Sequence, residues 1–82
     1  MRLDLFLKKT AIIKRRTIAK EIVERELVSI NGKIAKPSSE VKDGDTIHLK
    51  LGNREVDVKA IIEVKKDKEW PSFELLKETK LN

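Results

Sequence analysis

The sequence predicts an α+β domain in which two N-terminal helices pack on a small, mostly antiparallel sheet, followed by a short C-terminal helical tail. Three observations lead to this class. Apolar residues recur with helical spacing over the first quarter of the chain and alternate with polar residues after it. Glycine–asparagine pairs separate the alternating stretches, as turns in β-hairpins do. A length of 82 residues allows one small core and not two.

The first helix is expected over residues 3–9. Leu3, Phe6 and Leu7 recur at i, i+3 and i+4, which places them on one apolar stripe. Asp4 falls in the first turn, where the helix dipole stabilises a negative charge.

A second helix is expected from about Lys14 to Glu26. Its polar face carries Arg16, Lys20 and Glu24 at i, i+4 steps. Its apolar positions, which repeat with helical spacing, are Ile18, Ala19, Ile22 and Val23.

A first hairpin is expected around Asn31-Gly32, a strong turn signal. If the loop is Asn31-Gly32-Lys33, Ile30 faces Ile34 across the two strands.

A second hairpin is predicted more firmly, because both faces of its strands agree on one register. With a two-residue turn at Gly52-Asn53, apolar residues pair with apolar residues and basic groups with acidic ones. The predicted pairs are Ile47 with Val58, Leu49 with Val56, His48 with Asp57 and Lys50 with Glu55.

The predicted domain covers residues 1–62, and residues 63–82 are expected to form a connector and the helical tail. Ser72 is a suitable N-cap for that helix. Trp70 and Phe73 are expected to anchor the tail on the domain. No second domain or internal repeat is evident in the sequence.

Positive charge is concentrated at the N-terminal end of the chain. The formal net charge is +5, and residues 1–20 hold seven basic groups against one acidic group, which is +6 and leaves −1 for the rest. Lys14, Arg15 and Arg16 stand at the start of the second helix, where a cap and acidic residues would favour stability. Free N–H groups at a helix start already attract anions, so these three cations indicate phosphate binding.

Composition excludes several kinds of chemistry. The chain has no cysteine and one histidine, His48, and no arrangement of residues suited to catalysis, so we expect neither an enzyme nor a metal or other cofactor. No apolar run is long enough for a membrane span. Asp4 interrupts the N-terminal stretch that would be apolar in a secretion signal, so we expect a cytoplasmic protein. Aromatic residues make up 4% of the chain, which favours recognition of folded RNA through phosphates and shape over base stacking.

Three segments carry a resemblance to a known family: MRLDLFLKK at the start, IKRRTIAKEI from residue 13, and VSINGKIAKPSSEVKDGD from residue 28. Within them, RRTIA at 15–19 gives a basic pair followed by an alanine, and INGK at 30–33 gives the turn before a strand. Over residues 1–51 the chain thereby resembles the ribosomal protein S-four-type RNA-binding module (the alpha-L motif). The whole chain resembles its heat-shock-protein-fifteen-like branch.

The resemblance implies a non-catalytic RNA-binding factor of bacterial ribosome-associated quality control. Such a factor binds the rRNA of a large ribosomal subunit that still carries peptidyl-tRNA, at the intersubunit helix, and also the P-site tRNA. With an RqcH/NEMF-type factor it supports C-terminal alanine tailing of the stalled chain. The resemblance further implies no membrane partner and a monomer off the ribosome.

The resemblance also assigns candidate RNA-binding residues. Arg2 and Arg16 match the RNA-contacting arginines of the family, and Asp4 is expected to orient one of them by a charge-assisted hydrogen bond. The further candidates are Lys8, Lys14, Arg15 and Lys20 for phosphates, and Asn31 and Lys33 in the turn.

The sequence departs from the family pattern at four positions. Leu5 and Ala11 replace basic residues common in relatives, and Glu26-Leu27 replaces a glycine–arginine pair. Glu26 therefore stands where a left-handed C-cap would favour glycine.

Two other functions fit the sequence. The first is a heat-shock RNA chaperone or a maturation factor for the large subunit, which would not depend on peptidyl-tRNA. The second is a protein-interaction adaptor that uses Trp70, Phe73 and the C-terminal tail.

Overall fold

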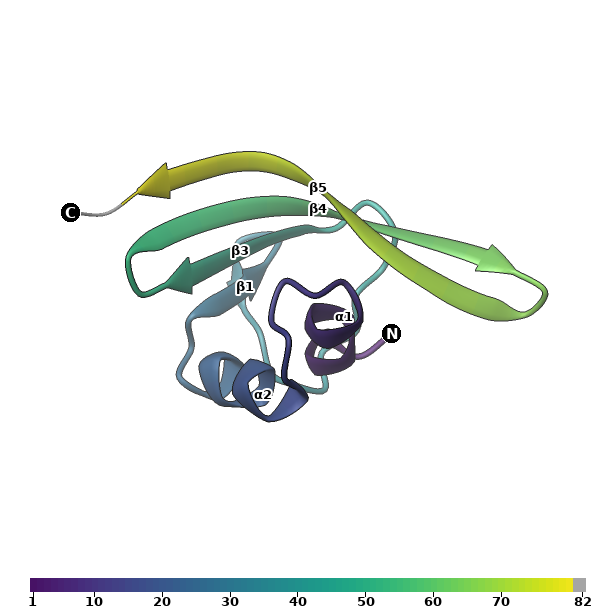
Figure 1. The fold of residues 1–82 in the computed structure, drawn as a ribbon, viewed down its shortest axis with the longest axis horizontal. Helices are drawn as coiled ribbons and strands as arrows, with labels where there is room; N and C mark the ends of the chain where they lie inside the picture. Colours follow the sequence, from purple (N-terminus) through teal and green to yellow (C-terminus); the bar gives the residue numbers. More distant parts are fainter. Residues whose placement is uncertain (81–82) are drawn as a thin grey trace.

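The computed structural model describes residues 1–80 and consists of two helices against one face of a five-stranded antiparallel sheet (Figure 1). The predicted α+β class is therefore confirmed. In that described part, neither helix has the length and apolarity needed to span a bilayer. The elements are α1 (Leu3–Lys9), α2 (Arg16–Glu24), β1 (Val28–Ile30), β2 (Lys33–Ile34), β3 (Thr46–Leu51), β4 (Arg54–Lys65) and β5 (Lys68–Lys80), with sheet order β2-β1-β3-β4-β5.

The core lies between the two helices and the inner face of the sheet. Phe6 is its largest side chain and is fully buried. The predicted apolar stripe of α1 is buried, and the alternating residues of β3 and β4 face it. The buried apolar residues are Leu3, Phe6, Leu7, Ala19, Val23, Val28, Ala35, Val41, Ile47, Leu49, Val56, Val58 and Ala60.

The loop before β3 fixes the start of α1. The Leu3 N–H donates to the Ser39 carbonyl at 2.8 Å, and the Asp4 N–H donates to the Pro37 carbonyl at 3.2 Å. These bonds satisfy two of the backbone donors that a helix start leaves free. They also explain how a seven-residue helix keeps one orientation, since its own hydrogen bonds would be too few.

The second helix is shorter than predicted at both ends, since it begins at Arg16 and ends at Glu24. Glu26 has φ +62°, so it takes the left-handed conformation that suits glycine. The chain therefore keeps the turn at this position without the residue that makes it least strained.

The first hairpin differs from the predicted pairing by one residue. Asn31 and Gly32, both with positive φ, form a two-residue turn, so Ile30 pairs with Lys33 and Ser29 with Ile34. A turn with positive φ at both central residues matches the twist of the strands, which explains why the shorter loop forms.

The second hairpin has the predicted register. Ile47 pairs with Val58, Leu49 with Val56, His48 with Asp57 and Lys50 with Glu55. The Nδ1 atom of His48 lies 2.6 Å from an Asp57 carboxylate oxygen, which is part of the charged outer face that the sequence predicted.

The predicted helical tail is wrong, because residues 68–80 form the long strand β5. It pairs with β4 along its length: Lys68 pairs with Lys65 at the tip, and Lys80 pairs with Arg54 at the other end. The register shifts between Asp57 and Val58. The prediction followed Ser72, which suits a helix N-cap. The strand also contains Pro71, a residue that is unusual in strands. Proline is tolerated in edge strands, and β5 is an edge strand. Positions 81 and 82 of the predicted tail lie outside the described residues.

The far halves of β4 and β5 form a twisted ribbon that projects beyond the helices (Figure 1). We call residues 61–75 of these strands and their turn the β4–β5 ribbon. Trp70 does not anchor this segment on the domain as predicted, since its side chain is 56% exposed. Phe73 reaches the domain more closely, beside Ile12 and Val58.

Candidate RNA-binding site

A buried carboxylate joins the starts of the two helices. Asp4 in α1 is 2% exposed, and its Oδ1 atom accepts a hydrogen bond from the Leu5 N–H at 2.8 Å. The Arg2 guanidinium donates to both Asp4 oxygens, Nε to Oδ1 and Nη2 to Oδ2, each at 3.2 Å. The Nε atom of Arg16, at the first position of α2, lies 3.5 Å from Oδ2. We call Arg2, Asp4 and Arg16 the arginine cluster.

The arginine cluster places the carboxylate inside and the guanidinium groups outside. The predicted hydrogen bond is present, with Arg2 donating to Asp4, and the same carboxylate also forms an ion pair with Arg16. Arg2 and Arg16 are 53% and 51% exposed, so each keeps donors that face solvent. Two guanidinium groups against one carboxylate leave a net positive charge, so Asp4 positions the two arginines without neutralising them both.

The backbone around Arg2 is held as firmly as its side chain. Arg2 pairs with Glu40 in an isolated β-bridge, and the Val41 N–H donates to the Met1 carbonyl at 2.8 Å. The Met1 ammonium forms an ion pair with Glu40. The segment before α1 is thus held to the loop before β3, and Arg2 projects from a fixed position.

The start of α2 has the features that the sequence suggested for an anion site. Arg15 is its N-cap residue, with extended backbone angles and no capping hydrogen bond from its side chain. The first turn contains no acidic residue. Lys14 and Arg15 are exposed in the segment that leads to Arg16. Free backbone N–H groups and these cations together favour a phosphate over a neutral ligand.

Two further candidates lie one helical turn away from the arginine cluster. Lys8 follows Asp4 by four residues in α1 and is exposed. Lys20 follows Arg16 by four residues in α2, and its Nζ atom lies 3.9 Å from a Glu24 oxygen. An exposed pair of this kind contributes little to stability, so Lys20 can exchange Glu24 for a phosphate.

The two candidates from the first hairpin are placed differently. The side-chain amide of Asn31 donates to Asp45 at 3.1 Å and accepts from the Thr46 N–H at 2.9 Å. Its polar groups are therefore used to hold the turn against the start of β3. Lys33 is exposed on β2, the edge strand opposite to β5. The structure thus brings Arg2 and Arg16 together at Asp4, whereas Asn31 and Lys33 lie at the first hairpin.

The sequence interpretation missed the basic residues at the tip of the β4–β5 ribbon. Lys65, Lys66 and Lys68 were taken as part of a connector. The alternation of Val56, Val58, Ala60, Ile62 and Val64 continues beyond residue 62 and was the available signal that the strand extends to the tip.

Comparison with known proteins gives a consistent assignment. The S4 domain family model matches residues 1–47. The RQC P-site tRNA stabilizing factor of Bacillus subtilis is 45% identical, with 99% of this chain and 98% of that protein covered. The protein of the same name from Streptococcus pneumoniae is 37% identical over 99% of this chain and 96% of its own.

A solved structure gives the same result for the fold. Vibrio cholerae heat shock protein 15, described as trimeric, superposes with a TM-score of 0.74 and 32% identity, covering 93% of this chain and 81% of that one. The match of the S4 domain model and the full-length relatives also agree with the resemblance noted from the motifs. The chain belongs to the S4 domain family and, within it, to the family of the RQC P-site tRNA stabilizing factors.

Proposed function

We propose that this protein binds large ribosomal subunits that carry peptidyl-tRNA, contacting the intersubunit helix of the rRNA and the P-site tRNA. It acts in the cytoplasm as a factor of ribosome-associated quality control. The names of the full-length relatives and the S4 domain support this role. It is a binding function and not catalysis.

The observation that carries the proposal is the arginine cluster. Asp4 holds two guanidinium groups at one surface, from Arg2 just before α1 and from Arg16 at the start of α2, and neither group is buried. Guanidinium groups bind phosphate oxygens through two parallel N–H donors, and a fixed position lowers the entropy lost on binding. The cluster therefore suits a backbone of fixed shape, such as folded RNA.

In this proposal the remaining basic candidates have an accessory role. Further phosphates along the two helices are contacted by Lys8, Lys14, Arg15 and Lys20. Asn31 and Lys33 contact the RNA only if the RNA extends past the sheet edge. With about four phosphates neutralised, affinity falls on the order of a hundredfold between 50 and 200 mM salt.

The proposal extends to a partner and an outcome. The bound factor stabilises the P-site tRNA while an RqcH/NEMF-type factor adds alanine residues to the C-terminus of the stalled chain. The protein supplies no reacting group, and its contribution is to keep the tRNA in place.

Co-sedimentation with large subunits tests the proposal. Arg16→Ala is expected to weaken association about tenfold or more, because it removes a charge-assisted phosphate contact. Arg25→Ala is the matched control, since Arg25 ends the same helix and pairs with Glu21 at 2.8 Å. Equal binding by the two variants at moderate salt would contradict the proposal.

The similarity to Vibrio cholerae heat shock protein 15 favours a second candidate, a heat-shock RNA chaperone or maturation factor. The two functions differ in their dependence on peptidyl-tRNA. Binding that is equally tight to empty and to peptidyl-tRNA-carrying large subunits would favour the second candidate.

We also propose that the protein is a monomer off the ribosome, although its structural neighbour is described as trimeric. Sedimentation of the free protein at micromolar concentration tests this. A species of three times 9.5 kDa would contradict it.

A further inference from the structure

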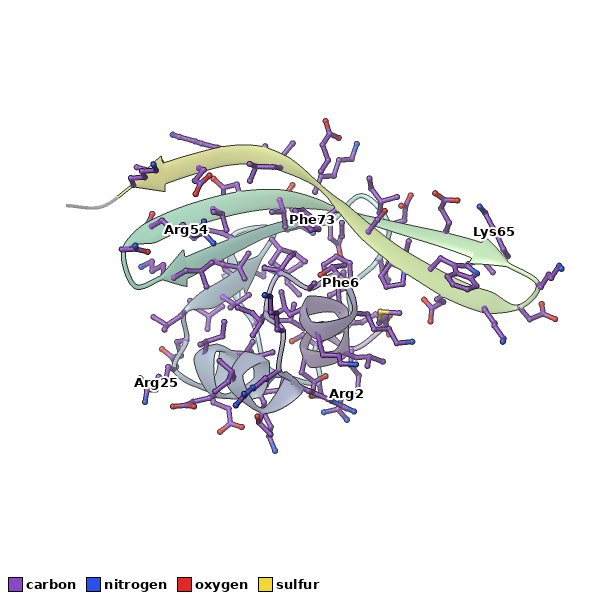
Figure 2. The ribbon with its side chains drawn as sticks, viewed as in Figure 1. Arg2, Phe6, Arg25, Arg54, Lys65 and Phe73 are labelled. Atoms are coloured by element: carbon purple, nitrogen blue, oxygen red, sulfur yellow. The ribbon has the colours of Figure 1, made fainter. Side chains whose placement is uncertain are left out.

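The β4–β5 ribbon carries a hollow of about 590 Å³ with Trp70 as one wall. In the strand register Trp70 pairs with Glu63, and Lys65 pairs with Lys68, so strand alternation places these four side chains on one face of the ribbon. Lys66, in the turn, also borders the hollow. An exposed indole is therefore surrounded by three lysines at the projecting end of the molecule, where Figure 2 shows Lys65.

Two of the nearby acidic groups are already paired. Glu63 lies 3.2 Å from the Nζ atom of Lys65, and Glu69 lies 3.7 Å from the Met1 ammonium. Within residues 1–80, Lys66 and Lys68 have no carboxylate at ion-pair distance. The hollow therefore offers two free ammonium groups beside the ring.

This arrangement is unfavourable for the stability of the ribbon. Lys65 and Lys68 are like charges directly opposite each other in the ladder. The turn residues Lys66 and Asp67 have φ of +52° and +63°, in a type of turn where asparagine and glycine are preferred. Neither feature stabilises the fold, and the lysines at the tip attract an anionic partner.

The hollow lies next to another one that borders α1 and the N-terminus. Trp70 and Lys68 also border a second hollow of about 520 Å³, together with Lys9 and Met1. Lys9, in α1, is therefore a further cation near Trp70.

We propose that the hollow on the β4–β5 ribbon binds one unpaired nucleotide of RNA, with its base stacked on the Trp70 indole and its phosphate held by Lys66 and Lys68. The inference rests on the proposed function, because the helical surface supplies the first contact with the same RNA. A flat ring accepts any base, whereas the flanking cations require a phosphate, so the site distinguishes unpaired from paired RNA and not one base from another. It also gives the chain a stacking contact that its low aromatic content argued against.

The intrinsic fluorescence of the protein tests this directly, because Trp70 is the only tryptophan in the chain. The probes are an RNA stem closed by an unpaired loop and a blunt duplex with the same number of phosphates. Binding is measured independently by the anisotropy of end-labelled RNA. The loop RNA is expected to quench Trp70 emission in step with binding, and the duplex is expected to bind without quenching it.

Variants separate stacking from charge. Trp70→Ala is expected to weaken binding of the loop RNA about fivefold to a hundredfold and to leave duplex binding unchanged. Trp70→Phe keeps a ring and is expected to restore most of the lost affinity. Leu76→Ala is the matched control, since Leu76 is an exposed apolar residue of β5 that does not border the hollow. Lys68→Gln is expected to reduce the slope of log affinity against log salt by about 0.7 for unpaired RNA.

Three results would overturn the inference. In the first, Trp70 emission does not change when the loop RNA is saturating. In the second, Trp70→Ala binds the loop RNA as tightly as the wild-type protein. In the third, Trp70→Ala loses ribosome association but binds every RNA as before. The last result would assign the hollow to a protein partner. The proposed function can fail separately. Unchanged large-subunit binding by Arg16→Ala would contradict the proposed function, but loop RNA would still quench Trp70 emission.

Discussion

The two halves of the structure are built differently, and two phenylalanines show it. Phe6 in the helical body is 0% exposed among residues from both helices and the sheet, whereas Phe73 on the β4–β5 ribbon is 40% exposed. The body is stabilised by apolar burial, and the ribbon mainly by its backbone ladder. Since the ribbon buries so little, its side chains are free to serve binding.

The same difference applies to the charged residues. In the body, Asp4 is buried and organises Arg2 and Arg16. At the tip of the ribbon, Lys66 in the turn and Lys68 in β5 have no such partner among residues 1–80. In the two proposals, the body therefore supplies a rigid contact for RNA of fixed shape, and the ribbon supplies an adaptable one.

The largest expected effect comes from truncating the two phenylalanines. Phe6→Ala should lower the free energy of unfolding by about 3–5 kcal/mol, because it leaves a cavity in the core. Phe73→Ala should lower it by about 1–2 kcal/mol, because only part of its area is buried. Urea denaturation followed by circular dichroism measures both, and equal losses would contradict the division between body and ribbon.

A smaller effect is expected for the buried carboxylate. Asp4→Asn removes the negative charge between two guanidinium groups and should lower the free energy of unfolding by about 1–3 kcal/mol. It should also weaken RNA binding, because Arg2 and Arg16 lose their fixed positions.

Asp67→Asn, in the exposed turn of the ribbon, is the control for Asp4→Asn. It should change the free energy of unfolding by less than about 0.5 kcal/mol. Thermal unfolding at one pH compares the two variants. If the Asp4 variant is as stable as the Asp67 variant, the carboxylate does not organise the arginine cluster.

Glu26 gives an effect of opposite sign. Its φ of +62° is strained for a residue with a side chain, so Glu26→Gly should raise the free energy of unfolding by about 0.5–1 kcal/mol. Glu24→Gly, within α2, should lower it by about 1 kcal/mol. The urea midpoints of the two variants should therefore move in opposite directions. Movement in the same direction would show that the backbone at Glu26 is not strained.

The smallest effect is expected at the tip of the ribbon. Replacing Lys66-Asp67 with Asn-Gly suits the positive φ values and should stabilise the turn locally by a few tenths of a kcal/mol. Amide hydrogen exchange near the tip should slow, while the urea midpoint should barely change because the body determines it. A large shift of the midpoint would show that the ribbon and the body unfold as one unit.

Elements with two agreeing signals were predicted correctly from the sequence. The second hairpin was fixed by its apolar face and by the charge pairs on its other face, so Leu49 could face only Val56. The first hairpin had one short alternating stretch, and its register was predicted one residue away. The C-terminal strand was missed because Ser72 carries a local helix-cap signal, which the pairing of β5 with β4 at the sheet edge overrides.

The candidate site divides in the same way. The excess of cations near the N-terminus and the uncapped start of α2 are properties of the sequence, and the family motifs named Arg2, Asp4 and Arg16. That one carboxylate holds both arginines could not be read from spacing, because it depends on how α1 packs against α2. RNA contact by any of these residues stays a prediction.

The sequence by itself determined the helices, the strands of the second hairpin and the sign of the charge at the N-terminal end, since periodicity and composition are local properties. Tertiary structure decided that Arg2 and Arg16 share one carboxylate, that the C-terminal segment forms an edge strand, and that Trp70 remains exposed on a projecting ribbon. The physical reason is that these outcomes depend on contacts between residues far apart in the chain, where edge position and helix packing outweigh local preference.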